Sequence, residues 1–216
     1  MPVPRTDAKM EMKRKSGIRI SHCGFTLTEL LVTIVIITVF MGLTFPAFQG
    51  AWNQARKTQA TNDLLQIVTA VNAYYTEYGR YPRTPTTPAD STYGSGTTNE
   101  KLFNELRAVS ATQNPRGIVY LSPPDAKDPN NPRAGISAAS ATVGQYFDPW
   151  GKPYLVRLDT NYDNQLDNPY AQNAGSTPLR SGVIAWSFGK DGFSQSTASP
   201  SDKNAGTNKD DVISWQ

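Results

Sequence analysis

Cysteine and histidine are nearly absent from this chain. Its 216 residues include one cysteine, Cys23, and one histidine, His22, and both lie within the first 24 residues. Residues 25–216 therefore contain no intramolecular disulfide, no Cys or His nucleophile or general base, and no zinc-ligand spacing. They also lack a phosphate-binding glycine motif. A hydrolase that uses only carboxylates has no short sequence signature, but this composition favours a protein that is not an enzyme.

Net charge is small outside the N-terminal segment. Residues 1–24 contain six lysines and arginines and two acidic residues, which leaves about −1 of the whole-chain charge of +3 for residues 25–216. Basic residues ahead of an apolar segment hold that end in the cytoplasm while the following chain is exported. Because the remainder is not basic, nucleic acid is not an expected partner.

One long apolar run follows the basic segment. Fourteen of the residues from Phe25 to Phe48 are Leu, Ile, Val or Phe, which predicts a single membrane-spanning helix over 25–48. The small residue Gly24 precedes this run, whereas a secretory signal carries its cleavage site after the apolar segment. Cleavage at Gly24 would therefore leave the anchor on the mature chain. The run carries one acidic residue, Glu29, near its start, and charge in lipid is usually functional.

The segment from Gly24 to Glu29, GFTLTE, resembles the processing site of the type IV pilin and type II secretion pseudopilin superfamily. The resemblance implies that residues 1–24 are a leader, that a prepilin peptidase cuts between Gly24 and Phe25, and that Phe25 is then N-methylated. It also implies an inner-membrane protein whose N-terminus is cytoplasmic before cleavage and whose C-terminal head is periplasmic. The plainer alternative is an uncleaved signal anchor with an incidental Glu29.

Glu29 has an expected role in assembly. A carboxylate about 6 Å into a helix could meet the N-terminal ammonium of a neighbouring subunit in a staggered homopolymer. Loss of one partner would leave the other charge unpaired in an apolar setting, which typically costs a few kcal/mol. The alternative is a side chain that snorkels to the lipid headgroups.

The helix is predicted to continue beyond the membrane to Tyr78, with residues 49–82 as an amphipathic half and its exit. Apolar residues recur there at steps of three and four: Leu64, Ile67, Val68, Val71, Tyr74, Tyr75 and Tyr78. Gly79 suits a C-cap, and Pro82 prevents continuation. Pro46 lacks an amide donor, so we expect a kink or local melting there. In related pilins, the matching proline lies where the helix loosens on assembly.

Residues 83–216 are predicted to form a globular head, with loops rich in turn-forming residues at 83–98 and 123–144. Asn99 is a candidate N-cap for a short helix. Compact apolar runs at Tyr154–Leu158 and Val183–Phe188 predict short strands. The expected fold class is α+β: a long N-terminal helix packed on a small antiparallel sheet.

Phe147 to Tyr154, FDPWGKPY, is similar to a motif of the major pseudopilin of type II secretion. This second resemblance implies a Ca²⁺ site formed by three aspartates and one backbone carbonyl: Asp191, Asp210, Asp211 and the carbonyl of Phe188. Carboxylates and carbonyls are the hard oxygen ligands that Ca²⁺ prefers. The long spacer from Gly192 to Lys209 departs from the family pattern, and solvated acidic turns are the alternative.

A lower-ranked calcium site follows the spacing of an EF-hand loop: Asp159, Asn161, Asp163 and Asp167. Asn164 stands in place of the usual glycine, and Tyr170 in place of the bidentate glutamate. An Asx-rich turn between strands is therefore the preferred interpretation.

Three functions remain open from sequence. The leading one is a structural subunit of a periplasmic pseudopilus, a homopolymer that works with minor pseudopilins and an inner-membrane assembly platform. The second is a type IV pilin or a minor pseudopilin, suggested by nearly 140 residues after Gly79. The third is a membrane-anchored periplasmic enzyme or binding module.

Overall fold

The computed structural model describes residues 24–82, 90–170, 172–193 and 202–216, without the side chains of residues 43 and 45–47. The chain divides into two compact units, residues 1–47 and residues 48–216. The elements in chain order are α1 (Leu27–Tyr78), β1 (Ser91–Tyr93), α2 (Glu100–Leu106), β2 (Gly135–Ile136), β3 (Tyr146–Phe147), β4 (Leu155–Leu158), β5 (Val183–Ser187), the 3₁₀ helix η1 (Gly206–Asp210) and β6 (Val212–Ile213). The α+β class predicted from sequence is confirmed.

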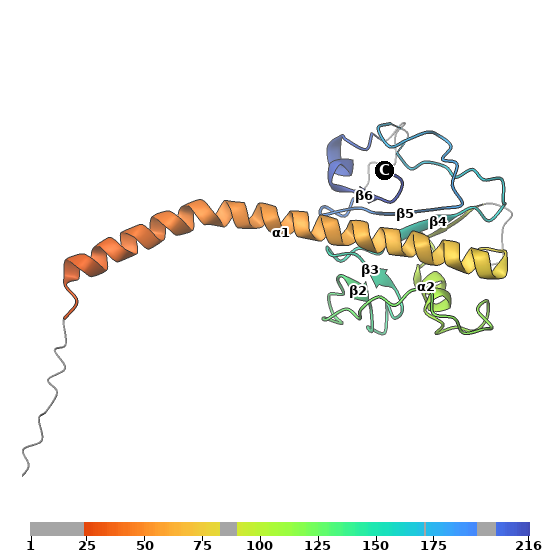
Figure 1. Ribbon diagram of the computed structural model, residues 1–216, viewed down its shortest axis with the longest axis horizontal. Coiled ribbons are helices and arrows are strands. Elements are labelled where there is room, and N and C mark those ends of the chain that lie inside the picture. The colour runs from red at the N-terminus through yellow and green to blue at the C-terminus, as the bar shows by residue number, and fades with distance from the viewer. Residues whose placement is uncertain (1–23, 83–89, 171, 194–201) are drawn as a thin grey trace, which may run out of the picture. The chain divides into compact units, whose positions relative to one another are not determined.

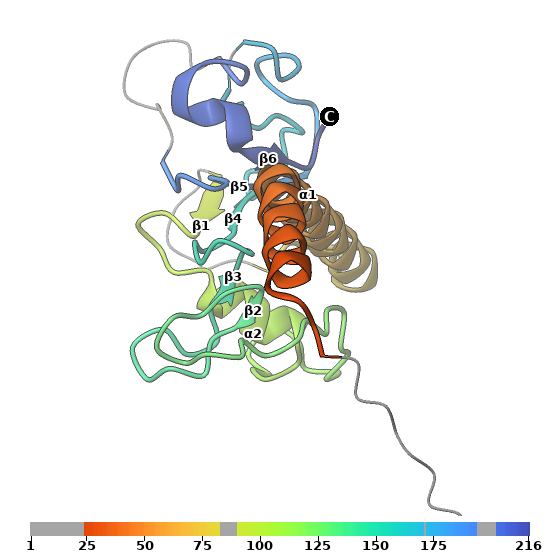
Figure 2. The same cartoon turned by 90° about the vertical axis from the view of Figure 1, so that its left-hand side faces the viewer.

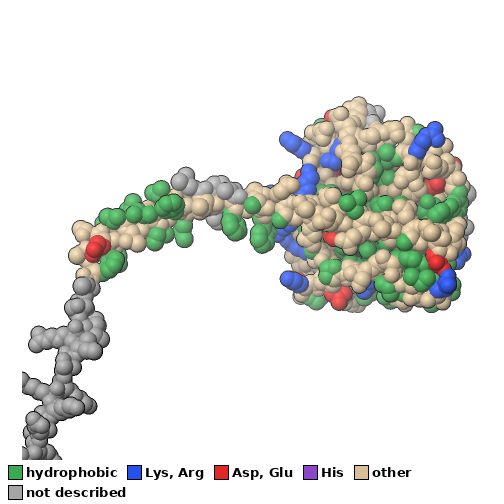
Figure 3. All heavy atoms as spheres, in the orientation of Figure 1, with side chains coloured by type: hydrophobic (Ala, Val, Ile, Leu, Met, Phe, Trp, Pro, Cys, Tyr) green, Lys and Arg blue, Asp and Glu red, His purple; other side chains and the backbone are tan. Residues whose placement is uncertain are grey.

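The first unit contains the start of α1, and its large apolar side chains are exposed in the single chain. They range from Leu27, 81% exposed, to Ile37, 47% exposed, and Figure 3 shows apolar side chains along this part of the helix. Within the described residues, no helix combines enough length with enough apolar character to span a bilayer. The topology proposed for residues 25–48 stays a prediction.

The second unit is built on the amphipathic half of α1, as its apolar periodicity predicts, except that Tyr75 of that pattern is 38% exposed. One face of this half is buried against the sheet and α2 through Ala60, Leu64, Ile67, Ala70, Val71 and Tyr74. Each large side chain removed from water in this way contributes about 1.5–3 kcal/mol of transfer free energy. In Figures 1 and 2, α2 with β2 and β3 lies on one side of this helix, and β6 with the C-terminal segment lies on the other.

Four antiparallel strands form the main sheet in the order β1-β4-β5-β6, and β2 pairs with β3 in a separate hairpin. Alternate residues of the strands point to opposite faces. Val156 and Ala185 face α1, whereas Leu155, Ile184 and Trp186 face a second core. That second core includes Leu166, Tyr170, Ala174 and Leu179, which lie in the connection between β4 and β5. Both faces of the sheet are therefore covered, although only the helix-side packing was predicted.

The loops predicted at 83–98 and 123–144 differ from the structure in two places. Ser91–Tyr93 forms β1 because it pairs with the edge of β4, and Gly135–Ile136 forms β2 because it pairs with β3. Strands of two or three residues depend on such partners and carry little local signal. Residues 83–89 lie outside the described part of the chain.

Asn99 precedes α2 as expected, but its side chain makes no capping hydrogen bond. Its amide group instead donates to the carbonyls of Tyr146 and Tyr154 at 3.0 and 2.9 Å, and its oxygen accepts the Tyr146 N–H at 3.2 Å. Asn99 is completely buried. These tertiary bonds satisfy its polar atoms, and they join α2 to the segment on either side of the DPWG motif.

Candidate functional site

The three aspartates of the predicted calcium site come together in the structure. Asp191 follows β5, Asp210 is the last residue of η1, and Asp211 lies between η1 and β6. One carboxylate oxygen from each lies within 4.8 Å of the others, which no other trio of acidic, His or Cys side chains matches among the described residues. Asp191 is exposed, Asp210 is half-buried and Asp211 is buried. The long spacer from Gly192 to Lys209 is therefore compatible with convergence of its two ends.

Asp210 fixes the turn that carries Asp191. Its Oδ2 atom accepts the backbone N–H groups of Lys190 and Asp191, the latter at 3.0 Å. Gly189 has φ +63°, and a Cβ atom there would lie 2.4 Å from the Asp210 carbonyl oxygen. Only glycine meets both the left-handed backbone and the close approach at this position. The turn and the C-terminal end of η1 are thus held in direct contact.

Asp211 is the buried member of the site. The Tyr170 hydroxyl donates to its Oδ2 atom at 2.5 Å, whereas its Oδ1 atom is buried and has no hydrogen-bond partner within the described residues. Burial raises the pKa of Asp211 to about 7, and the bond from Tyr170 and the charge of Lys203 act in the opposite direction. A buried carboxylate oxygen without a partner is costly, and a cation beside it would satisfy it.

Asp148, the first residue of the DPWG motif, holds two turns through one carboxylate. Its Oδ1 atom accepts the N–H groups of Trp150 and Lys152 at 2.9 and 2.8 Å, which closes the motif's own turn. Its Oδ2 atom accepts the Ser187 hydroxyl at 2.5 Å, and the oxygen of Ser187 accepts the Gly189 N–H at 3.1 Å. Burial raises the pKa of Asp148, while these hydrogen bonds oppose the shift. The motif is therefore connected to the turn that carries Asp191.

The Phe188 carbonyl, the predicted fourth ligand, accepts the Gly192 N–H at 3.2 Å. A carbonyl oxygen has two lone pairs, so this bond leaves one acceptor position. Its part in metal binding stays a prediction. Three carboxylates at this spacing, with one buried oxygen that lacks a partner among the described residues, fit a hard divalent cation such as Ca²⁺.

In the lower-ranked site, the carboxylates accept hydrogen bonds mainly from backbone N–H groups of the same loop. Asp159 accepts the N–H groups of Asp163 and Asn164 at 3.2 and 2.8 Å, and Asp163 accepts the Gln165 N–H at 2.9 Å. Asn161 is bonded to Asp163 through both its amide oxygen and its amide nitrogen. This is the geometry of an Asx-rich turn, as preferred from sequence.

Two other residues complete the description of this loop. Asp167 contributes its backbone carbonyl to the Arg157 guanidinium at 2.7 Å. Tyr170 is directed to Asp211 and so belongs to the other site. Asp159, Asp163 and Asp167 do not form a cluster of three carboxylates within the described residues.

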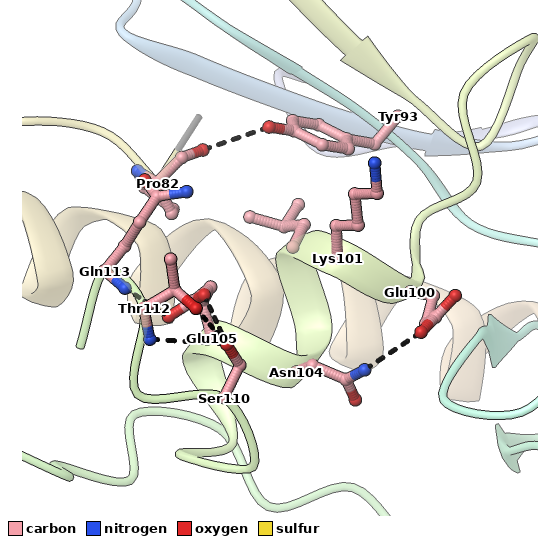
Figure 4. A pocket seen from close by; sticks show the side chains of 10 residues that line it. Pro82, Tyr93, Glu100, Lys101, Asn104, Glu105, Ser110, Thr112 and Gln113 are labelled. Atoms are coloured by element: carbon pink, nitrogen blue, oxygen red, sulfur yellow. Dashed lines mark hydrogen bonds between the residues drawn. The ribbon is translucent and has the colours of Figure 1, made fainter. Parts of the chain in front are cut away.

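A pocket of about 320 Å³ lies beside α2, lined by residues of this helix and of the segments around Pro82 and Ser110–Gln113. Figure 4 shows Glu105 directed toward Ser110, whose hydroxyl donates to it at 2.7 Å, and it also accepts the Gln113 N–H at 3.0 Å. The Tyr93 hydroxyl donates to the Pro82 carbonyl at 3.2 Å. These polar groups are paired with one another, which suits a structural role.

Glu29 caps the start of its own helix in the single chain. Its carboxylate accepts the Thr26 N–H at 2.9 Å and the Thr26 hydroxyl at 2.7 Å, and its own N–H donates to the Thr26 hydroxyl oxygen at 3.3 Å. This reciprocal pattern is a capping box. The T-x-x-E spacing of Thr26 and Glu29 could have indicated it from sequence. The role of Glu29 in assembly stays a prediction.

The structure describes only some of the other residues named in the N-terminal predictions. α1 continues through Pro46, and the two compact units divide just after it, between Ala47 and Phe48. The side chain of Pro46 is outside the described atoms, so its kink stays a prediction. Gly24 and Phe25 are described and exposed, whereas the leader before them, residues 1–23, lies outside the described residues.

Sequence analysis missed two residues that support the candidate metal site, Ser187 and Tyr170. Ser187 immediately precedes Phe188, and its place in the WSFG segment offered a weak local signal. Tyr170 lies 41 residues before Asp211. Its role arises from the second core, which no local pattern predicts.

Comparison with known families gives one match. The model of the prokaryotic N-terminal methylation motif matches residues 19–45, which include the expected cleavage site and Glu29. No protein with a curated description and no solved structure matches the chain. The motif indicates a membrane-anchored N-terminus and processing by a prepilin peptidase. Together with the α+β architecture, it supports a type IV pilin-like or pseudopilin-like protein, which is a structural rather than an enzymatic class.

Proposed function

We propose that this chain is the structural subunit of a periplasmic pseudopilus of a type II secretion system. It is cut between Gly24 and Phe25, N-methylated on Phe25, and polymerised on an inner-membrane platform together with minor pseudopilins. The observation that carries the proposal is one combination. A methylation motif opens the long helix, and a carboxylate cluster lies in the C-terminal loop of the head, connected through Ser187 to the DPWG motif.

The exposed apolar face of the first unit supports assembly. Side chains such as Leu30, Val35 and Phe40 are 51–64% exposed in the single chain. Contiguous apolar surface of this kind marks a protein or membrane contact. Lipid covers it before assembly, and neighbouring helices cover it in the filament.

Glu29 then has two successive partners. In the single chain, its carboxylate is held by Thr26 and is exposed. A carboxylate accepts several hydrogen bonds at once, so a neighbour's N-terminal ammonium can join this group without loss of the cap. The pair would set the axial register of subunits in an apolar surrounding.

A matched pair of variants tests this role. Glu29→Ala removes both the cap and the assembly charge, whereas Thr26→Val removes the capping hydroxyl and keeps the carboxylate. We expect normal membrane insertion for both, loss of most crosslinked oligomer in cells for Glu29→Ala, and near wild-type oligomer for Thr26→Val. Equal oligomer yields for Glu29→Ala and wild type would exclude the charge pair.

In this proposal, Asp191, Asp210, Asp211 and the Phe188 carbonyl hold Ca²⁺ in the head. The ion supplies positive charge that fixes the two ends of the spacer to each other. Tyr170 orients Asp211, and Ser187 holds the turn before Asp191 in place. The support is the convergence of the carboxylates and the buried oxygen of Asp211 that lacks a partner among the described residues.

Two experiments test the function as a whole. Mass spectrometry of the chain extracted from membranes should show an N-terminus at Phe25 with one added methyl group, and a mature chain that begins at Met1 would contradict the proposal. Gene deletion should abolish secretion of folded exoproteins and leave surface pili intact.

The second candidate is a type IV pilin or a minor pseudopilin. The large head favours it, with nearly 140 residues after Gly79 and a second core over the outer face of the sheet. The same deletion separates the two, because loss of surface pili with intact secretion would select the pilin.

A further inference from the structure

Lys203 is a buried lysine in the spacer between Asp191 and Asp210. It is 7% exposed, and its Nζ atom donates to the Asn208 carbonyl at 3.1 Å. Lysine is almost never buried without a compensating partner. Lys190 and Lys209, the lysines adjacent in sequence to Asp191 and Asp210, are exposed. Lys203 therefore needs an explanation that these two do not.

The ammonium of Lys203 lies next to the backbone of Asp211. The Asn208 carbonyl that accepts the Lys203 ammonium also accepts the Asp211 N–H, at 3.2 Å. The side-chain amide of Asn208 donates to the Asp202 carbonyl at 3.0 Å, which closes the segment around the lysine. The fold of residues 202–211 thus fixes a positive charge near the backbone of Asp211, without a direct ion pair to the cluster among the described residues.

The surrounding charges agree with this placement. Burial lowers the pKa of Lys203, the negative charges of Asp211 and Asp210 oppose that shift, and the positive charge of Lys57 on α1 adds to it. The carboxylates of the site are therefore among the groups that favour a charged ammonium here. A neighbouring cation also repels any second cation, and the repulsion is stronger away from bulk water.

We propose that Lys203 is an internal counter-charge for the Asp191–Asp210–Asp211 cluster, one that stabilises the fold of residues 202–211 without metal and lowers the affinity of the cluster for Ca²⁺. The inference rests on the proposed metal-binding role of the cluster. It explains how the enlarged spacer is compatible with that role, because the described end of the spacer, residues 202–209, carries the lysine beside Asp211. Lys203 is thus a residue that sets affinity, and it is not a ligand.

The test uses calorimetry to compare Ca²⁺ binding by full-length chains in detergent. Lys203→Met removes the charge and keeps the apolar stem, Lys203→Arg keeps the charge, and Lys101→Met removes an exposed lysine from α2. We expect Lys203→Met to bind Ca²⁺ at least fivefold more tightly than wild type, and the other two variants to bind within twofold of it.

Protease cleavage of the C-terminal loop in EGTA gives a second measurement. Metal-free Lys203→Met should be cut at least threefold faster than wild type, and Ca²⁺ should remove this difference. If Lys203→Met does not fold, Lys203→Gln takes its place as a polar variant without the charge. The same results are expected for it in both measurements.

The possible outcomes separate this inference from the proposed function. Ca²⁺ binding by wild type with unchanged affinity in Lys203→Met and Lys203→Gln would overturn the inference and leave the metal site intact. Ca²⁺ binding by Lys203→Met but not by wild type would support the inference, because it would mean that Lys203 prevents measurable binding in wild type. Absence of binding in wild type and in both charge-removing variants would overturn the metal site and the inference together.

Discussion

Two acidic loops of the head look alike in composition and differ in how their oxygens are used. The loop from Asp159 to Asp167 is local in sequence, and its side chains accept N–H groups from within the loop. The cluster of Asp191, Asp210 and Asp211 is assembled from two segments. One of its oxygens is buried without a partner among the described residues.

The difference shows why spacing alone is weak evidence for a metal site. Aspartate and asparagine at alternate positions satisfy backbone N–H groups in a turn as readily as they bind a cation. A carboxylate that is buried and left without a donor has no such alternative use. Within the two loops themselves, the buried oxygen of Asp211 is therefore a better distinction than the count of acidic residues, although Asp90, beside the other loop, also has a buried oxygen without a partner among the described residues.

The largest expected effect is the loss of Ca²⁺ stabilisation. Asp210→Asn keeps the size of the side chain but removes one charge from the cluster, and Asp163→Asn makes the same change in the other loop. Ca²⁺ should protect wild type and Asp163→Asn from proteolysis and should give Asp210→Asn little protection. The reverse pattern would move the site to the loop of Asp159.

Gly189→Ala should destabilise the head by about 2–4 kcal/mol, because it combines a left-handed backbone with backbone overlap. The overlap is with the carbonyl of Asp210, 2.4 Å from the added Cβ. The matched control is Asn164→Ala in the other loop, where φ is +57°. That change should cost about 1 kcal/mol from conformation alone. Urea denaturation measures both, and equal losses would show that the contact with Asp210 is unimportant.

Ser187→Ala should cost about 1–3 kcal/mol, because it leaves a buried carboxylate oxygen of Asp148 without its donor. Ser187 also accepts the Gly189 N–H, so Ca²⁺ affinity should fall as well. Ser176→Ala is a control in the β4–β5 connection, where the hydroxyl bond is exposed. Chemical denaturation and Ca²⁺ titration of both variants provide the comparison. A Ser187→Ala chain with reduced stability but unchanged affinity would separate the DPWG turn from the metal site.

Much of the fold could be predicted from the sequence because its main signals are local. The three- and four-residue periodicity of Leu64, Ile67 and Val71 predicts the buried face of α1, and the compact apolar runs predict β4 and β5 to within one residue at each end. By contrast, β1 and β2 depend on pairing partners far away in sequence. Their few residues carry no periodicity of their own.

The candidate site also contains residues that the sequence predicted and residues that it did not. Asp191, Asp210 and Asp211 could be predicted together because a family resemblance supplied the connection between segments. Ser187 and Tyr170 could not, since their roles depend on the packing of the sheet's outer face. The same packing buries Asp211 and leaves its second oxygen without a described donor, so the strongest structural argument for a metal was invisible in the sequence.

The smallest expected effect is a pH dependence of stability that arises in part from Asp211. Burial raises the pKa of Asp211 to about 7 from an ordinary value of 3.8. Its contribution to stability is complete below pH 4 and is lost as the pH rises to about 7, because the unfolded chain releases this proton first.

Metal-free wild type should therefore melt a few degrees lower at pH 7.5 than at pH 5, as measured by circular dichroism in EGTA. Burial raises the pKa of Asp63, Asp90 and Asp148 as well, so these groups contribute in the same direction. The diagnostic quantity is the difference between variants: Asp211→Asn should show a smaller change than wild type, and Asp128→Asn, at an exposed position, should match wild type. Ca²⁺ binds the ionised carboxylate, so saturating Ca²⁺ should remove the Asp211-dependent part. Equal slopes for wild type and Asp211→Asn would mean that Asp211 is not the group that holds the proton.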